Sequence, residues 1–516
     1  MRARTVLLLA ATAIEALAAP SQAPFEAPLT PAKQKLNGRF LHITDMHPDP
    51  HYIPRTSVKK SCHRKTPKKK EDEAGYFGSP YGECDSPLRL TNFTLDFLEE
   101  HWASEIDFVI WTGDNARHDE DHQIPRTTAE IFDTNRRVAS KMHEIFSERG
   151  IPVVPSLGNN DVWPHVTMIF CAWNIMEPGP NIITNAYSSI WKRFIPFPSY
   201  QVFQRGAYYS TDVIPNRVGA ISLNTLYFYD SNKAVGGCEF TDPEDAGNLQ
   251  LDWLEVQLET FRKRKMQFYF VEANDLKIWI DPPLKVATSG LFEGIISTFT
   301  NIPKKSKMNH DEYGVINVSP AVVPNPYLPS FRIFTYNITD AGSAMIPAES
   351  LVHTAKDRTP RHGSGKVGDK KKLCKLKEYR NTWKCQLTEE WHSDEEAPSR
   401  QNRLWSPLGY AQYYLPNLDS ADKHHAPKYK LEYMTFRPQD LHPHNNETHF
   451  HYPVPLRNLP KSLRNDTVTK SKYAPYRMKD LTIPSWIKLA YKLADPKRKK
   501  LRKKFKKFMF MGGKEG

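Results

Sequence analysis

The chain has 516 residues, of which 39% are hydrophobic and 12% aromatic. This composition is ample for a large core and excludes a chain too poor in apolar residues to fold. Lys and Arg outnumber Asp and Glu by 71 to 58, which gives a formal net charge of +13 and favours an anionic partner. Nucleic acid is not expected as that partner, because the sequence holds no base-reading motif.

Residues 1–19 have the pattern of a secretory signal. Arg2 and Arg4 form a basic start, an apolar stretch follows, and Ala16-Leu17-Ala18 offers a small-residue cleavage site. The apolar stretch is too short for a comfortable membrane span. Two outcomes stay open, a cleaved signal peptide and a short signal anchor that keeps the bulk of the protein in the lumen. Residues 20–37 are a Pro-rich spacer.

A main domain is predicted at 38–340, and three short apolar runs within it each end at polar residues. The runs 40–44, 108–112 and 153–157 have the pattern of buried strands. The polar residues that follow them are Asp45 and His47, then Asp114, then Asn159. Ligands of open α/β sheets gather beyond the carboxyl ends of the strands. Carboxylate, amide and imidazole groups together suit divalent metals, whereas each motif alone is also ordinary turn chemistry.

The rest of this domain is predicted from its pattern. Thr127-x-x-Glu130 is a capping box that starts a helix between the second and third strands, which gives a β-α-β arrangement. Residues 207–229 have the pattern of a hairpin around Pro215-Asn216, and a helix over 251–265 leads into a strand at 266–271. A mixed sheet follows from these elements.

Longer stretches around the strand ends carry a resemblance. They read HITDMHPDPHY at 42–52, WTGDNARHD at 111–119, PSLGNNDVWPH at 155–165 and SLNTLYFYD at 222–230, and later GVINVSPAVVPN at 314–325, WSPLGYAQYY at 405–414 and DLTIPSWIKLA at 480–490. The chain from about Phe40 to Met511 resembles the calcineurin-like metallophosphoesterases, and among them the fungal vacuolar endopolyphosphatases, which are related to acid sphingomyelinase. The resemblance implies an α/β fold, a two-sheet β-sandwich flanked by helices, with an irregular C-terminal extension.

The resemblance also implies the chemistry of the site. Asp45 and His47 would hold one divalent metal, Asp114 would bridge it to a second, and Asn159 would bind that second metal. The identity of the metals stays open among Mg, Mn, Fe, Co and Zn. His118 matches the histidine that protonates the leaving oxygen. The alternative for His118 is a solvated loop histidine.

The family pattern breaks within 271–313. Family members carry a Gly-His-Val-Pro after a strand and a further Gly-His motif, and these histidines complete both metal shells. Here Val271 is followed by no histidine until His310, which lacks both the strand and the glycine before it. One interpretation is a faulty gene model or splice product, a second is a half-built site that no longer hydrolyses, and a third is that Glu272 or Asp275 substitutes as a ligand.

Several features agree with passage through the secretory pathway to the vacuole. Glycan-acceptor tripeptides begin at Asn92, Asn337, Asn446 and Asn465. The six cysteines are an even number, as an oxidising compartment allows. By proximity we expect Cys62 to pair with Cys84 and Cys374 with Cys385, which leaves Cys171 for Cys238. The alternative for each pair is free thiols.

The C-terminal third is predicted in three parts. Residues 354–372 form a basic linker, and 373–470 are irregular and rich in His, Pro and Tyr, within an extension that covers 373–516. The extension ends in a pair of basic amphipathic helices, with nine Lys and Arg between Lys497 and Lys507. Three interpretations stay open for them: an apolar face that packs on the main domain with solvated charge, a polyanion-binding surface, or contact with an anionic membrane.

The leading hypothesis is metal-dependent hydrolysis of internal phosphoanhydride bonds in inorganic polyphosphate. A second basic run, with Lys68, Lys69 and Lys70, is a candidate to bind phosphates along the chain. Two alternatives are a sphingomyelinase-like phosphodiesterase and a catalytically impaired member that binds polyanions without cutting them.

Overall fold

The computed structural model describes residues 35–163, 165–168, 171–174, 176–229, 232–236, 242, 244–271, 290–339, 374–377, 380, 385, 392–442 and 453–511. Residues 1–36 form a unit separate from 37–516, and the account below concerns the second unit. The predicted signal at 1–19, the linker at 354–372 and the glycan acceptor Asn446 lie outside the described residues.

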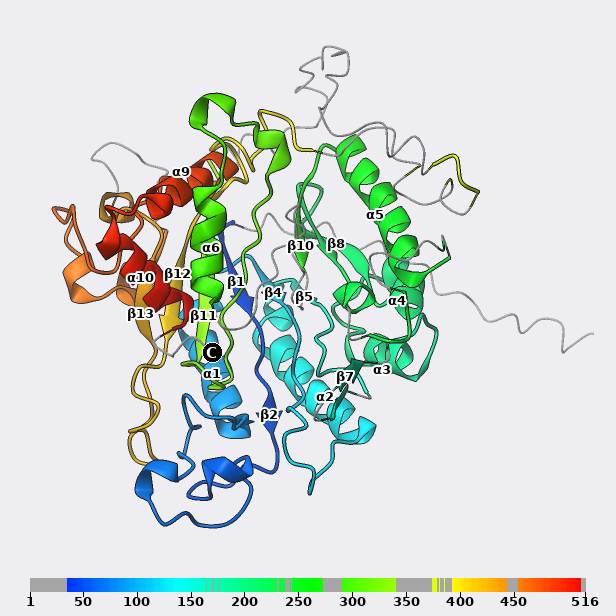
Figure 1. Cartoon of the computed structure of the whole chain (residues 1–516), viewed down its shortest axis with the longest axis vertical. Coiled ribbons are helices and arrows are strands. Elements are labelled where there is room, and N and C mark those ends of the chain that lie inside the picture. Colours follow the sequence, from blue (N-terminus) through cyan, green and yellow to red (C-terminus); the bar gives the residue numbers. More distant parts are fainter. Residues whose placement is uncertain are drawn as a thin grey trace, which may run out of the picture. The chain divides into compact units, whose positions relative to one another are not determined.

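A six-stranded mixed sheet lies at the centre of this unit (Figure 1). Its strands, in spatial order, are β13 (Lys430–Met434), β12 (Pro407–Tyr414), β11 (Ser330–Tyr336), β1 (Arg39–Ile43), β4 (Phe108–Trp111) and β5 (Val153–Pro155). Strands β1, β4 and β5 run parallel, and the other pairings are antiparallel. The three predicted strands are therefore confirmed as neighbours, and their carboxyl ends meet at one edge of the sheet.

Helices connect the parallel strands, as such strands require. Helix α1 (Leu88–Trp102) lies between β1 and β4 in the chain, and α2 (Thr128–Ile145) lies between β4 and β5. The Thr127 side chain caps α2 by accepting the N–H of Glu130, at 3.2 Å. The Glu130 side chain, the other member of the predicted capping box, accepts from Arg117 at 2.6 Å instead. Glu130 therefore holds the loop that contains Arg117.

A smaller sheet packs against the first. It consists of β8 (Tyr209–Ile214), β9 (Val218–Ser222) and β10 (Gln267–Val271), in which β8 and β9 form the predicted hairpin. The Tyr269 ring of β10 lies 5.3 Å from the Phe40 ring of β1. The Ser222 hydroxyl donates to the Pro155 carbonyl at 2.8 Å. These contacts confirm the predicted two-sheet arrangement.

The remaining elements surround the two sheets. The small sheets are β2 (Pro48–Asp49) with β3 (Ser86–Pro87), and β6 (His165–Met168) with β7 (Cys171–Asn174). The helices are α3 (Ile182–Ile190), α4 (Tyr200–Gly206), α5 (Ala246–Lys263), α6 (Leu291–Thr300), α9 (Ile483–Ala494) and α10 (Lys499–Met509). In the part of the chain with described coordinates, no helix combines the length and the apolar content needed to cross a bilayer.

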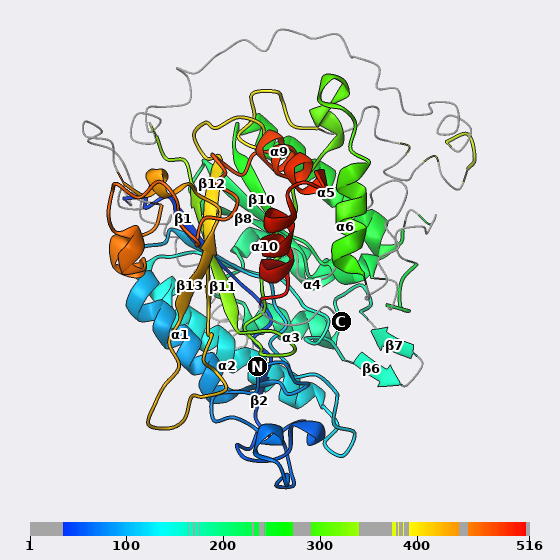
Figure 2. The ribbon, with the colours of Figure 1, turned by 60° about the vertical axis from the view of Figure 1, so that its left-hand side comes forward.

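The C-terminal extension belongs to the main sheet, which corrects the expectation that all of 373–470 is irregular. Strands β12 and β13 lie in this range and extend the sheet beyond β11 (Figure 2). Tyr413 of β12 buries its ring 5.3 Å from Trp102 of α1. The extension is therefore part of the core of the main domain, although most of its other described residues are irregular.

Candidate active site

The loops after β1 and β4 hold each other in an unusual backbone conformation. Asp45, His47 and Asp114 have φ angles of 49°, 38° and 56°, in the left-handed region that non-glycine residues rarely adopt. The Asp45 N–H donates to the Gly113 carbonyl at 3.1 Å, and the His47 N–H donates to the Asp114 carbonyl at 3.2 Å. Such strain persists where the surroundings fix the backbone, and it is common at functional sites.

The side chains of these loops converge on one point. His47 Nε2 lies 3.5 Å from Asp45 Oδ1 and 3.6 Å from Asp114 Oδ2. The potential ligand atoms of the three residues all lie within 4.8 Å of one another. His47 Nδ1 donates to the Ala116 carbonyl at 2.7 Å, which leaves Nε2 as the nitrogen that faces the carboxylates. Two carboxylates and an oriented imidazole make a donor set that fits a divalent cation.

The pKa values of this cluster reflect buried charges close together. Burial opposes the charge of His47, but the contact with Asp45 and the charge of Asp114 raise its pKa to about 10. Burial raises the pKa of Asp114 to about 7 despite the neighbouring His47. The cluster therefore favours a positive charge between its carboxylates, and metal binding at such sites displaces protons.

The loop after β5 completes this side of the site. The Asn160 N–H donates to Asp114 Oδ1 at 2.8 Å. At Gly158 a Cβ atom would lie 2.1 Å from Asp114 Oδ1, so only glycine fits there. Asn159 lies between these two residues and is half-buried. The loop that carries the predicted ligand Asn159 is thus packed directly on Asp114.

Asp161 fixes the positions of these loops and was not singled out from the sequence. It is fully buried. Its Oδ2 accepts the backbone N–H groups of Asp114 at 2.8 Å and Gly158 at 3.1 Å. Its Oδ1 accepts the N–H of Asn115 at 2.8 Å and the Asn135 amide at 3.1 Å. One carboxylate therefore ties the loops after β4 and β5 to helix α2.

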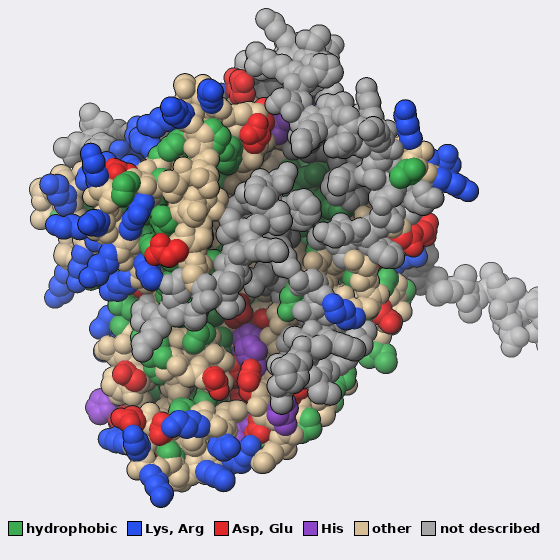
Figure 3. Space-filling view, in the orientation of Figure 1, with side chains coloured by type: hydrophobic (Ala, Val, Ile, Leu, Met, Phe, Trp, Pro, Cys, Tyr) green, Lys and Arg blue, Asp and Glu red, His purple; other side chains and the backbone are tan. Residues whose placement is uncertain are grey.

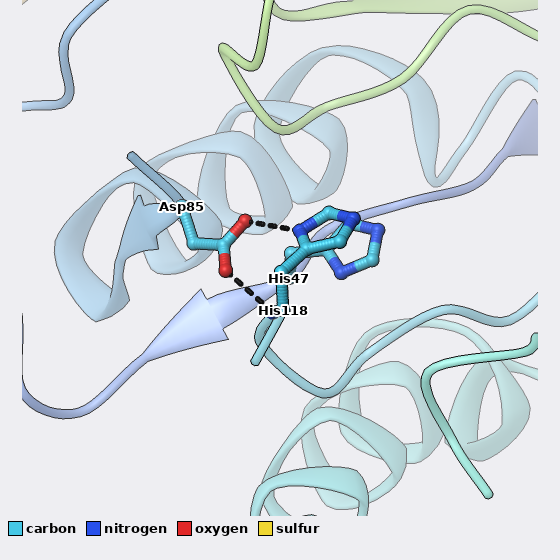
Figure 4. Close-up of side chains that lie close together, drawn as sticks. All are labelled: His47, Asp85 and His118. Carbon is cyan, nitrogen blue, oxygen red and sulfur yellow. Dashed lines mark hydrogen bonds and ion pairs between the residues drawn. The ribbon is translucent and has the colours of Figure 1, made fainter. Parts of the chain in front are cut away.

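His118 lies against the cluster with a carboxylate behind it (Figure 4). Its ring stacks on the His47 ring with centroids 4.2 Å apart. Asp85 Oδ1 accepts from His118 Nδ1 at 2.7 Å, and Asp85 Oδ2 accepts the His118 N–H at 2.6 Å. Although burial acts in the opposite direction, the charge of His118 lowers the pKa of Asp85. This contact leaves His118 Nε2 as the nitrogen available to a substrate, and 28% of the side chain is exposed.

Comparison with known proteins agrees with this geometry. Residues 38–280 match the family model for calcineurin-like phosphoesterase. An endopolyphosphatase of Cryptococcus neoformans var. neoformans serotype D is 34% identical, in an alignment that covers 93% of this chain and 92% of that protein. This chain belongs to the calcineurin-like phosphoesterases.

Further relatives are similar to this phosphoesterase over different lengths. An endopolyphosphatase of Schizosaccharomyces pombe is 29% identical over 89% of the chain and 83% of that protein. One of Saccharomyces cerevisiae is 43% identical, but over only 46% of the chain and 35% of that protein. The alignment with the Cryptococcus protein runs over 638 residues, which is longer than the chain. The Cryptococcus protein therefore has segments without a counterpart here.

The segment in which the family pattern breaks adds no ligand from its described part. Strand β10 ends at Val271, and Glu272 and Asp275 lie outside the described residues. His310 lies in a short 3-10 helix, where its neighbour Asp311 pairs with Arg400. Within the described ranges, the groups of potential metal ligands are Asp45 with His47 and Asp114, and His47 with Asp85 and His118. The structure does not bring His310 to the site.

A disulfide anchors the residue behind His118. Cys62 and Cys84 are bonded, as predicted, with an S–S distance of 2.09 Å. Asp85 follows Cys84 directly, and the N–H of the next residue, Ser86, donates to the His47 carbonyl at 3.1 Å. The second predicted disulfide, Cys374–Cys385, is also present. Cys238 lies outside the described residues, so its predicted bond to Cys171 stays a prediction.

A buried ionic network links the disulfide loop to the loop that carries His118. His63 contacts Asp49 at 2.7 Å through Nε2 and Asp121 at 2.6 Å through Nδ1. Arg64 also pairs with Asp121. Because the chain from His118 to Asp121 is short, this network restrains the position of His118.

The predicted phosphate-binding lysines lie on the surface of the loop that the Cys62–Cys84 disulfide closes. Lys68, Lys69 and Lys70 are exposed, and Lys69 pairs with Glu71 at 3.3 Å. Nearby, Lys59 pairs with Asp72 at 3.3 Å. Acidic residues of the segment therefore offset part of its positive charge, and its role in substrate binding stays a prediction.

Proposed function

We propose that this protein is a metal-dependent endopolyphosphatase that hydrolyses internal phosphoanhydride bonds of inorganic polyphosphate. The observation that carries the proposal is the match with a protein named endopolyphosphatase over nearly the full length of both chains. The matched region includes the cluster of Asp45, His47 and Asp114 and the adjacent His118. No similarity to a protein named for another activity supports the phosphodiesterase alternative among the relatives described above.

In this proposal the buried cluster holds the metal. Asp45 and His47 would bind one divalent cation, Asp114 would be shared with a second, and Asn159 would bind the second. Cations held there would neutralise charge on the phosphate oxygens and activate a water molecule. Asp161 and Gly158 keep Asp114 in place, which preserves the geometry while substrate binds and leaves.

His118 would supply the proton for the leaving group. A water molecule forms a bond to phosphorus and gives a proton to the solvent, and the P–O bond to the leaving phosphate breaks. The departing oxygen takes the proton of His118 Nε2, and water from the solvent reprotonates the ring. Asp85 holds the ring through Nδ1, which leaves Nε2 to face the substrate. The side chain of His118 is partly exposed, whereas His47 is buried. This difference supports proton transfer by His118 and metal binding by His47.

The test is hydrolysis of long-chain polyphosphate by the purified full chain after removal of metals with a chelator. We expect no cleavage in the chelator and recovery when Mg, Mn, Fe, Co or Zn is added back. Asp114→Asn should fold with normal secondary structure but fail to recover. If the unmodified protein leaves long polyphosphate intact with every metal, the proposal is wrong. The lack of the later Gly-His motifs in 271–313 would then explain the missing activity.

We also propose that the protein reaches the vacuolar lumen through the secretory pathway. The two disulfides suit an oxidising compartment. Of the predicted glycan acceptors, Asn92 and Asn465 are exposed, and Asn337 is half-buried. A mobility shift after endoglycosidase treatment, lost in Asn465→Gln and Asn92→Gln, would support this route. A fully unglycosylated protein with free thiols in cells would contradict it.

A further inference from the structure

The C-terminal helix pair has a strongly unbalanced charge. Residues 477–511 contain thirteen Lys and Arg but only two acidic residues, Asp480 and Asp495. Asp480 is buried and caps the turn before α9 by accepting from Thr482. Asp495 lies 3.6 Å from Arg498. Most of the positive charge in this segment therefore has no acidic partner within it.

The apolar side of α10 is already covered by the protein. Phe508 is 8% exposed, and its ring stacks on Tyr433 of β13 with centroids 4.5 Å apart. Phe505 lies beside Phe292 of α6 and Tyr476, with centroids 6.2 Å apart in both cases. An amphipathic helix enters a membrane through its apolar face. Since this face packs on the sheet, the helix presents its charged face instead.

The charged face is held in a fixed orientation. Arg502 donates to the carbonyl groups of Leu493 and Ala494, each at 2.6 Å. These carbonyls belong to the end of α9, so Arg502 fixes α10 relative to α9. Lys500, Lys503 and Lys504 are exposed. Across the described ranges these three lysines form no ion pair at 4.0 Å or less, so their charges are available to a ligand.

Neighbouring elements extend the positive surface. Tyr491 of α9 donates to the Pro303 carbonyl, which places the loop after α6 beside α9. Lys304 and Lys307 in that loop are exposed. The pKa of Lys492 is lowered by burial and by nearby positive charges, among them Lys488 and Arg498. Lys488, Lys492 and Arg498 thus add to the positive charge around α9 and α10.

The basic helix α10 and the candidate active site both adjoin the six-stranded sheet. Figure 3 shows Lys and Arg gathered over α9 and α10, with histidine and acidic side chains nearer the centre of the same view. Helix α10 packs on β13, and β13 is separated from β1 by β12 and β11. Neighbouring strands lie about 4.8 Å apart, so the two strands are roughly 14 Å apart. A long flexible polyanion can span such a separation, whereas a short one occupies a single site.

We propose that the exposed basic face of α10, with Lys500, Lys503 and Lys504, is a docking site for the polyphosphate chain outside the catalytic centre. The inference rests on the proposed function, because it takes polyphosphate as the ligand. Docking raises the local concentration of the substrate and favours long chains over short ones. The basic run at Lys68–Lys70 is a weaker candidate, because acidic residues of its own segment offset its charge.

The test compares two triple variants of the full chain that lose the same charge. One is Lys500→Gln, Lys503→Gln and Lys504→Gln. The control is Arg262→Gln, Lys263→Gln and Lys265→Gln, three exposed residues at and just after the end of α5. Both are made in the Asp114→Asn background and titrated with fluorescent long-chain polyphosphate in chelator, so that binding is measured without cleavage.

We expect the α10 variant to bind at least 10-fold more weakly and the control to stay within about twofold. The slope of log K against log salt should fall by about 2, since each lost contact with a single-stranded polyanion removes roughly 0.7. In active protein that keeps Asp114, the α10 substitutions should raise KM for long chains and leave tripolyphosphate hydrolysis unchanged. Equal affinity of the two variants would overturn the proposal.

Two further outcomes separate this inference from the proposed function. If the α10 variant loses polyphosphate binding but the unmodified protein cleaves nothing, the docking site stands and the hydrolase proposal fails. If cleavage is normal and the α10 variant binds as the control does, only the docking site fails. Lysine-dependent binding to phosphatidylserine vesicles, without lysine-dependent binding to polyphosphate, would assign the surface to a membrane and overturn the inference.

Discussion

The loops after β1, β4 and β5 differ sharply from the segment that follows β10. The three loops come from adjacent parallel strands of one sheet, and they share hydrogen bonds through Asp114 and Asp161. The described part of the other segment, 290–313, follows a strand of the second sheet and contributes α6, which packs beside α9. Its histidine, His310, lies in a short 3-10 helix and is half-buried.

The loops of the site therefore depend little on the segment in which the family motifs are missing. Asp45, His47 and Asp114 are positioned mainly by contacts among the three loops, and the Val323 N–H also donates to the Asp45 carbonyl at 2.7 Å. None of the hydrogen bonds to these three residues described here comes from the described part of 271–313. The cluster of Asp45, His47 and Asp114 is therefore assembled without contacts from the described part of that segment. The predictions that follow test whether the hydrogen-bonded cluster alone supports binding and catalysis.

The largest effect is expected for Asp114→Asn, which removes the carboxylate shared within the cluster. A metal stabilises the charge of the transition state by several kcal/mol. Loss of this stabilisation should lower kcat/KM by roughly 10³-fold or more. Hydrolysis of polyphosphate at saturating metal measures the change. A matched substitution at His310, His310→Ala, should leave the rate within about twofold. Equal losses in both variants would mean that the segment after β10 takes part in the site.

The next largest effect is expected for His118→Ala, because general acid catalysis contributes about 10²- to 10⁴-fold. A nitrophenyl phosphate ester has a leaving group that needs no proton, so the variant should lose much less activity on it. Asp85→Asn should lower polyphosphate hydrolysis about 10-fold, because the His118 ring loses the carboxylate that orients it. If His118→Ala loses equally on both substrates, His118 is not the proton donor.

A smaller effect, mainly on stability, is expected when the Cys62–Cys84 disulfide is removed. Opening a crosslink between residues 22 positions apart should lower the free energy of unfolding by about 2–4 kcal/mol. Because Asp85 follows Cys84, kcat should fall as well. Removal of Cys374–Cys385 should reduce stability without a change in kcat. Denaturant titrations and rates of the two double Cys→Ser variants distinguish these outcomes.

The smallest effect is expected from Glu432, which lies on β13 far from the ligand loops in the sheet order. Burial raises the pKa of Glu432 to about 7, although the Gln412 amide and Lys507 act in the opposite direction. The folded state thus prefers the protonated carboxyl, and this stabilisation, present below pH about 4.5, is lost as the pH rises through 7. Glu432→Gln should stabilise the protein by about 2 kcal/mol at pH 8 and hardly at all at pH 4.5. The same difference at both pH values would contradict the assignment.

The sequence was sufficient for the ligand strands because their pattern is local. Apolar runs that end at Asp45, Asp114 and Asn159 predict strands with polar residues at their carboxyl ends, and the structure has β1, β4 and β5 there. The Thr127 cap, the 209–222 hairpin and the two disulfides within short loops are local in the same sense.

The parts that were missed depend on contacts between distant residues. Asp85 meets His118 from 33 positions away, and Asp161 meets Asp114 from 47 positions away. No spacing rule within the sequence marks either carboxylate. Strands β12 and β13 were missed because their Pro- and Tyr-rich surroundings suggest irregular structure, whereas pairing with β11 decides their conformation.

Internal cleavage is tested by the lengths of the products formed at early times from long-chain polyphosphate of uniform length. Internal cleavage by the metal-dependent site predicts fragments of intermediate length that appear before monophosphate and disappear in chelator. Unchanged long chains, or monophosphate as the first product, would show that the protein does not cleave polyphosphate internally.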